Sequence, residues 1–143
     1  MSASSSVTII IPGQLDFLRL VDKVSDAVTA YAGFAVGERD AISIAIIEAC
    51  TNAIQHGCCC DQAKAVTVTY SMEGDDLKVT VVDPGAGFDP EGLKCDIGNG
   101  VEERGRGFAI IKALMDDVQY DFTNGTSITM VKHLGAAREE TGT

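Results

Sequence analysis

The 143-residue chain lacks the two features that would place it in a membrane or on nucleic acid. No apolar run comes near the roughly 20 residues that a membrane-spanning helix needs. Positive charge is scarce, because 11 Lys and Arg stand against 21 Asp and Glu and give a formal net charge of −10. General binding to DNA or RNA relies on basic residues that neutralise phosphates. We therefore expect no membrane span and no direct nucleic-acid partner, although a small phosphate ligand needs only a few N–H groups, one arginine and a metal ion.

The chain also lacks a secretory signal and the spacing of a zinc site. Its Ser-rich start has no basic segment, and the apolar stretch at residues 7–11 is too short for a signal peptide. The five cysteines are an odd number, and Cys58, Cys59 and Cys60 are adjacent rather than spaced as C-x-x-C. These absences predict a cytoplasmic, reducing location, and they favour the three cysteines as apolar filler at a helix end over a metal site.

What is present fits one globular unit. The chain is 45% apolar and 22% charged, which is ordinary for a folded domain. A chain of this size buries roughly two-thirds of its unfolded surface, enough for a single core. We expect one domain over residues 1–143, with flexible ends at 1–6 and 135–143.

The hydrophobic spacing predicts an order of elements. Residues 65–72 and 77–82 alternate as a hairpin, whereas residues 15–31 and 38–56 have helical spacing. Glycines crowd residues 85–107 without periodicity, which predicts a long mobile lid loop. A strand at 7–11, a short helix at 108–115 and a hairpin of 118–123 with 126–132 complete the order. The order β-α-α-β-β-loop-α-β-β predicts an α+β, two-layer sandwich with a largely antiparallel mixed sheet and three helices on one face.

The second predicted helix carries a polar stripe. Glu48, Asn52 and His56 recur every four residues and therefore stack along one side, drifting by about 40° per step. A solvated helix face would give the same pattern. Alternatively, the Asn52 amide oxygen suits Mg²⁺ and Glu48 can deprotonate a group that attacks a phosphate, while His56 meets carbonyls at the helix end.

A second motif, Asp83-Pro84-Gly85-Ala86-Gly87, follows the first hairpin. A simple turn explains this composition equally well. The two glycines would also let the backbone approach a flat ligand closely. A carboxylate fixed at the strand end can accept a hydrogen bond from an exocyclic amine such as adenine N6.

A third motif, Gly105-Arg106-Gly107, is predicted to open the third helix. Free N–H groups and the helix dipole could hold an anion there, with Arg104 and Arg106 adding charge. The motif is not a P-loop, because Gly-Lys-Ser/Thr is missing, and it is not a dinucleotide fingerprint, because it follows a loop rather than a strand. Alone, it is also compatible with a plain Gly-rich loop.

Together and in this order, the three motifs resemble the N, G1 and G2 boxes of the GHKL (Bergerat-fold) ATPases, over nearly the whole chain. Asn52-Ala53-Ile54-Gln55-His56-Gly57 and Glu103-Arg104-Gly105-Arg106-Gly107-Phe108 are most similar to bacterial anti-sigma-factor serine kinases. Two departures are a lid without an obvious basic cluster and Phe108 where many relatives have Leu.

The resemblance implies a role for each matched residue. The implied roles are Glu48 as general base, Asn52 as Mg²⁺ ligand, Asp83 as adenine-N6 acceptor, Gly85 and Gly87 as walls of the base pocket, Arg104, Gly105 and Gly107 as holders of the terminal phosphates, and Thr126 as a further adenine contact. Arg104 is also expected to take part in catalysis.

The implied function is an ATP- and Mg²⁺-dependent serine kinase that phosphorylates an anti-anti-sigma (STAS-type) partner and sequesters a sigma factor. Relatives commonly pair, so a homodimer is also expected. Two alternatives stay open: a nucleotide-sensing module that binds a partner without turnover, and a detached histidine-kinase catalytic domain.

Overall fold

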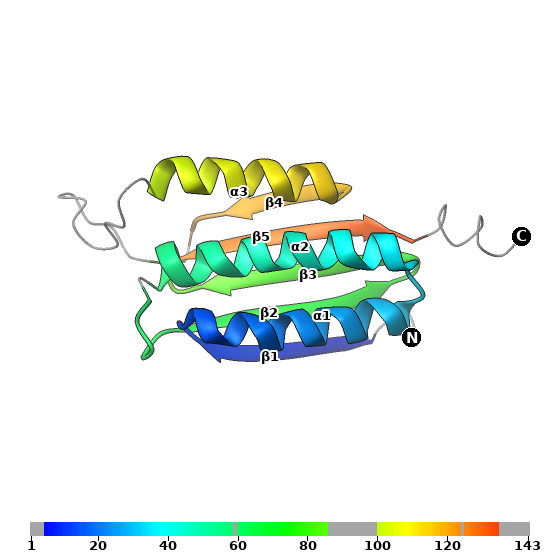
Figure 1. The fold of residues 1–143 in the computed structure, drawn as a ribbon, viewed down its shortest axis with the longest axis horizontal. Coiled ribbons are helices and arrows are strands. Elements are labelled where there is room, and N and C mark those ends of the chain that lie inside the picture. The colour runs from blue at the N-terminus through cyan, green and yellow to red at the C-terminus, as the bar shows by residue number, and fades with distance from the viewer. Residues whose placement is uncertain (1–4, 59, 86–99, 124, 135–143) are drawn as a thin grey trace, which may run out of the picture.

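The computed structural model describes residues 5–58, 60–85, 100–123 and 125–134, with only the backbone described at 100–105. The elements follow the expected order (Figure 1). They are β1 (Ser6–Pro12), a 3₁₀ turn (Leu15–Phe17), α1 (Leu18–Ala32), α2 (Val36–Asn52), a π-helical turn (Ala53–Gly57), β2 (Ala65–Glu73), β3 (Asp76–Asp83), α3 (Gly100–Leu114), β4 (Asp117–Asp121) and β5 (Thr126–His133).

The five strands form one sheet in the order β1-β2-β3-β5-β4. All four pairings between the described strands are antiparallel, which agrees with the expected largely antiparallel sheet, and no parallel pair occurs in this part of the chain. The three helices lie side by side over one face (Figure 1), which confirms the predicted two-layer α+β sandwich. None of the helices in the described part of the chain is long and apolar enough to cross a membrane.

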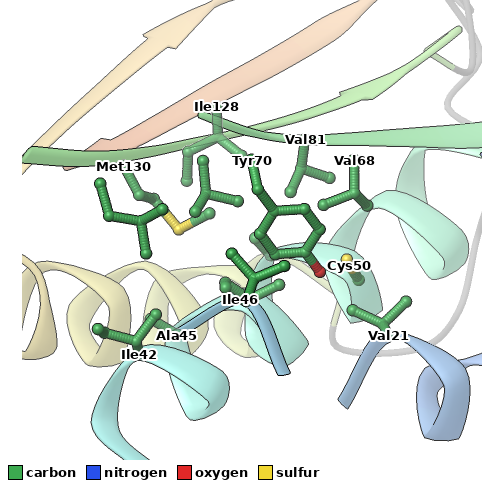
Figure 2. Close-up of a cluster of buried hydrophobic side chains, with 14 of the residues drawn as sticks. Val21, Ile42, Ala45, Ile46, Cys50, Val68, Tyr70, Val81, Ile128 and Met130 are labelled. Carbon is green, nitrogen blue, oxygen red and sulfur yellow. The ribbon is translucent and has the colours of Figure 1, made fainter. Parts of the chain in front are cut away.

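The core lies between the sheet and α2. The predicted inward face of β2 is confirmed, since Val66, Val68 and Tyr70 are fully buried and Met72 is 4% exposed. On α2, the row formed by Ile42, Ala45, Ile46 and Ala49 is buried as well. Its alanines let the helix approach the strands closely. Figure 2 shows Ile42, Ala45 and Ile46 of this row beneath side chains from the sheet.

Two glycines lie near the junction of α1 and α2, and one of them ends a helix. Gly33 ends α1 with a φ of 101°, a left-handed conformation that glycine adopts without strain. The second helix begins two residues earlier than predicted, because α2 starts at Val36 and contains Gly37 in its first turn. At that position the helix N-terminus has free N–H groups in any case, so one glycine is tolerated.

The third helix begins earlier than the sequence suggests. α3 starts at Gly100, so residues 100–107 are helical rather than part of the predicted lid. The acidic pair Glu102 and Glu103 lies in the first turn, where the helix dipole favours negative charge. The rest of the predicted lid, residues 86–99, lies outside the described residues, as do both predicted flexible ends apart from residues 5 and 6.

The last hairpin is confirmed, with β4 shorter than predicted. The Thr123 backbone N–H donates to Asp121 Oδ1 at 2.9 Å, and this local bond turns the chain away from the strand after Asp121. Gly125 follows with a φ of 80°, and β5 then returns to pair with both β4 and β3.

Candidate nucleotide site

A small pocket lies where α2, α3 and the ends of three strands meet. It brings together three residues predicted to bind the nucleotide, namely Asn52, Asp83 and Thr126. The remaining lining residues are Ala49, Ala53, Val81, Phe108, Tyr120, Phe122 and Ile128. The pocket therefore joins the first and second predicted motifs to the turn before β5, although these segments are far apart in the chain.

The polar stripe of α2 faces α3 rather than solvent. A Cβ atom placed on Gly107 would lie 3.0 Å from Asn52 Nδ2 and 3.3 Å from Glu48 Oε2. The absence of a side chain at Gly107 thus leaves room for the two polar groups between the helices. Asn52 Nδ2 is buried and has no hydrogen-bond partner among the described residues, so it remains able to donate a hydrogen bond. The solvated-face alternative is therefore wrong for this stripe.

Asp83 is buried at the end of β3, with only 5% of its surface exposed. The Gly85 N–H donates to its Oδ1 at 2.7 Å and fixes the carboxylate against the turn. Gly57 lies on the other side, so close that a Cβ atom there would overlap the Asp83 carboxyl group. The sequence identified Gly57 only as the end of a helix, because nothing local to residue 57 reveals which strand end it meets.

Two further glycines bring the Asp83 turn and the hairpin turn into contact. Gly85 and Gly125 both have positive φ, at 74° and 80°. A Cβ atom on Gly85 would lie 2.8 Å from Gly125 Cα, and one on Gly125 would overlap the backbone of Asp83 and Pro84. This close approach places Thr126 directly opposite Asp83 in the β3–β5 register. Gly85 therefore lies at the turn beside Asp83, and its role as a wall of the base pocket stays a prediction, while Gly87 lies outside the described residues.

Aromatic side chains that the sequence did not single out as ligands form the remaining wall. The Phe108 and Tyr120 rings lie 4.6 Å apart, centroid to centroid, with planes tilted by 50°. The Tyr120 and Phe122 rings are stacked at 6.1 Å, with planes 9° apart. The enclosed volume is only about 20 Å³, close to the space that one water molecule needs.

The third motif differs most from its prediction. Gly105, Arg106 and Gly107 lie inside α3 rather than at its start, so their N–H groups belong to the helical hydrogen-bond pattern. The helix N–H groups without an internal partner are those of the first turn, from Gly100. The Arg106 side chain is exposed, and the Arg104 side chain lies outside the described part of the structure.

Cys58 lies against this site from the π-helical turn. Burial and, secondarily, the negative charge of Asp83 raise the pKa of its thiol to about 11. Cys58 is therefore a neutral, apolar neighbour of Asp83 at physiological pH, in line with the filler expected at the helix end. Cys60 is exposed, and Cys59 lies outside the described residues.

Comparison with known proteins agrees with this arrangement. Residues 11–132 match the family described as the histidine kinase-like ATPase domain. The chain is 30% identical to the serine-protein kinase RsbW of Bacillus velezensis, over 93% of this chain and 88% of the relative. It is 33% identical to the serine-protein kinase RsbW of Bacillus cereus, over 87% of this chain and 82% of the relative.

Solved structures share the fold at lower identity. A structure of the RsbU and RsbW domains of a Mycobacterium tuberculosis protein aligns with 91% of this chain at a TM-score of 0.69 and 21% identity, and the match spans 32% of that longer chain. The histidine kinase domain of a blue-light activated kinase from Erythrobacter litoralis aligns with 97% of this chain at a TM-score of 0.56 and 20% identity, and the match spans 72% of that chain. The chain belongs to the histidine kinase-like ATPase domain family, and within it to the serine-protein kinases related to RsbW.

Proposed function

We propose that this protein is an ATP-dependent anti-sigma factor that phosphorylates a serine on an anti-anti-sigma partner of the STAS type and sequesters a sigma factor. The observation that carries the proposal is the pocket in which Asn52, Asp83 and Thr126 meet, with Glu48 beside Asn52 at Gly107. The relatives named serine-protein kinase support the reaction type.

The pocket residues fit an adenine nucleotide. Asp83 supplies a buried carboxylate that can accept from the adenine amine, and Thr126 lies opposite it. The apolar side chains of Ala53, Val81 and Ile128 suit the faces of a purine ring. Because the pocket encloses about 20 Å³, we expect α3, which carries Phe108, to move outward when the base enters, while Tyr120 keeps its place on β4.

The residues present also fit a magnesium ion that arrives with the phosphates. No cluster of three His, Cys, Asp or Glu suited to a metal ion exists among the described residues, so the protein would contribute few ligands of its own. Asn52 is the fitting ligand, since its side chain lines the pocket and its amide oxygen Oδ1 is the kind of oxygen that Mg²⁺ binds. When bound, Mg²⁺ neutralises charge on the transferred phosphoryl group.

Glu48 is proposed to accept the proton of the attacking serine hydroxyl. It lies one helical turn before Asn52 on α2 and faces α3 at Gly107. Its side chain is partly exposed, which leaves room for a partner's serine to reach it. In phosphoryl transfer the protein contributes mainly positioning and charge stabilisation, so Glu48 orients the hydroxyl as well as deprotonating it.

Arg104, Gly105 and the segment before them are proposed to hold the terminal phosphates. This role requires the first turns of α3 to rearrange, because Gly105 lies inside the helix here. Such a rearrangement would let ATP and ADP favour different partners through the order of the lid. The cytoplasmic location and the homodimer belong to the same proposal.

The decisive test separates chemistry from binding. Wild type and Glu48→Gln are incubated with Mg-ATP and a purified STAS-domain partner, and the partner's mass is followed over time. We expect the variant to lose at least about 100-fold in phosphorylation rate, as for removal of a general base, while its affinity for Mg-ADP stays within about twofold.

The matched control is Asp40→Asn, which removes an exposed carboxylate from the same helix, about 12 Å along its axis from Glu48. Asp40→Asn should phosphorylate at the wild-type rate. Equal rates in wild type and Glu48→Gln would show that Glu48 is not the base. Nucleotide binding by wild type without any phosphate on the partner would instead favour the nucleotide-sensing module.

A further inference from the structure

Tyr120 is a pocket residue to which none of the predicted motifs assigns a role. It lies on the edge strand β4 and pairs with Ile128 of β5, so both side chains point to the helix-covered face. Both line the pocket together with Asp83 and Asn52. Tyr120 is therefore placed to meet any ligand that Asp83 holds.

The Tyr120 hydroxyl is buried and has no hydrogen-bond partner among the described residues. Burial also raises the pKa of this hydroxyl, so it stays neutral and keeps its proton to donate. An unsatisfied buried hydroxyl costs free energy, and folded proteins leave few of them. A ligand that accepts from this hydroxyl would remove that cost.

The aromatic neighbours restrict where the hydroxyl can go. Phe108 packs against one side of the Tyr120 ring at 4.6 Å, and Phe122 stacks on it at 6.1 Å. Two ring contacts and the pairing of β4 with β5 leave the Tyr120 ring little freedom to turn its hydroxyl towards solvent. The donor is thus positioned before the ligand arrives, which lowers the entropic cost of the hydrogen bond.

The pocket chemistry indicates which ligand atom is involved. Asp83 can only accept, so it pairs with the exocyclic amine of adenine. The ring nitrogens of the purine are acceptors and need a donor. We infer that the Tyr120 hydroxyl donates a hydrogen bond to a ring nitrogen of the bound adenine, which makes Tyr120 a specificity-determining residue of the site. This inference rests on the proposed function, because it requires the pocket to bind adenine nucleotides.

The test combines a variant with altered nucleotides. Wild type, Tyr120→Phe and the control Tyr31→Phe, which changes an exposed tyrosine on α1, are titrated calorimetrically with Mg-ADP. They are also titrated with its 1-deaza, 3-deaza and 7-deaza analogues, each of which replaces one ring nitrogen by CH. We expect Tyr120→Phe to bind Mg-ADP roughly three- to tenfold more weakly, the size of one net hydrogen bond.

One deaza analogue should bind wild type more weakly than Mg-ADP by the same factor. It should bind Tyr120→Phe no more weakly than Mg-ADP does, because the two changes remove the same hydrogen bond. The melting temperature of nucleotide-free Tyr120→Phe should equal or exceed that of wild type, since an unsatisfied hydroxyl has been removed. A purely structural hydroxyl would instead lower it.

Two results for Tyr120→Phe would overturn the inference: unchanged affinity for Mg-ADP, or weaker binding whose loss adds to that of every deaza analogue. In either case, binding of Mg-ADP by wild type would still support the proposed function. No binding of Mg-ADP by wild type would overturn both.

Discussion

Two buried tyrosine hydroxyls in different regions of the sheet differ in whether they have a hydrogen-bond partner. Tyr70 on β2 exchanges a 2.8 Å hydrogen bond with Ser25 of α1, deep in the core. Tyr120 on β4, under α3, has its hydroxyl buried with no partner among the described residues. Figure 2 shows the Tyr70 ring reaching into the helical layer near Ile46 and Cys50. The Tyr70 hydroxyl thus has its partner within the protein, whereas the Tyr120 hydroxyl has none among the described residues.

The same contrast extends to other groups. Asn52 Nδ2 is unsatisfied like the Tyr120 hydroxyl, and both residues line the pocket. In the α1–β2 region, the Thr29 hydroxyl donates to the Ser25 carbonyl at 2.8 Å. Functional sites commonly hold such unsatisfied groups at the expense of stability. Changes near the pocket should therefore affect ligand binding, and changes near Tyr70 should affect stability.

The largest effect on nucleotide affinity is expected from a substitution at Gly57, which lies against Asp83 of the pocket. In Gly57→Ala the new Cβ atom overlaps the Asp83 carboxyl group, so the carboxylate must leave its position. We expect affinity for Mg-ADP to fall by at least about 30-fold, the size of one lost hydrogen bond to a charged group. Isothermal titration calorimetry measures this loss.

Gly37→Ala is the matched control, because nothing lies within 4 Å of a Cβ atom at position 37. It should leave affinity unchanged and stabilise α2 slightly, by up to about 1 kcal/mol. Wild-type affinity in Gly57→Ala would show that Asp83 does not need its present position.

A smaller effect, on stability alone, is expected in the α1–β2 region. Ser25→Ala leaves the Tyr70 hydroxyl buried without its partner, which should lower the free energy of unfolding by about 1–3 kcal/mol. Urea denaturation measures this change, and Mg-ADP affinity should stay as in wild type. The double variant Ser25→Ala with Tyr70→Phe removes both groups and should recover part of the loss. A loss of nucleotide affinity comparable to that of Gly57→Ala would contradict the division between the two regions.

The smallest effect concerns the end of β3 far from Asp83. There His133 Nδ1 lies 2.6 Å from Asp76 Oδ1, and this hydrogen bond raises the pKa of the exposed His133 imidazole. Because the folded pKa lies above the unfolded value of about 6.5, the stabilisation is complete below that pH and is lost as pH rises through the folded pKa.

Asp76→Asn should therefore lower the melting temperature more at pH 5.5 than at pH 8, without changing Mg-ADP affinity. An NMR titration of the His133 ring checks the shift directly. An equal change at both pH values would exclude His133 as its source.

Local patterns were enough to predict much of the fold. The alternation of residues 65–72 places every second side chain on one face, and Val66, Val68 and Tyr70 are indeed fully buried. The order of all elements followed from such periods. The start of α3 at Gly100 did not, because glycines obscure the helical pattern there.

The site was predictable to a similar degree. Asn52 and Asp83 carry recognisable chemistry in motifs and Thr126 was implied by the family resemblance, and the pocket brings the three together, while their roles stay predictions. Gly57 and Tyr120 were missed, because their importance comes from contacts with residues distant in the sequence, which no local motif reveals.

The central claim is that the pocket lined by Asn52, Asp83 and Thr126 selects adenine nucleotides. The most direct measurement is a calorimetric titration of the wild-type protein with Mg-ADP and, separately, Mg-GDP. The account predicts saturable binding of Mg-ADP and at least about 100-fold weaker binding of Mg-GDP, since guanine presents an oxygen where Asp83 requires a donor. Equal affinities, or no binding of Mg-ADP, would contradict it.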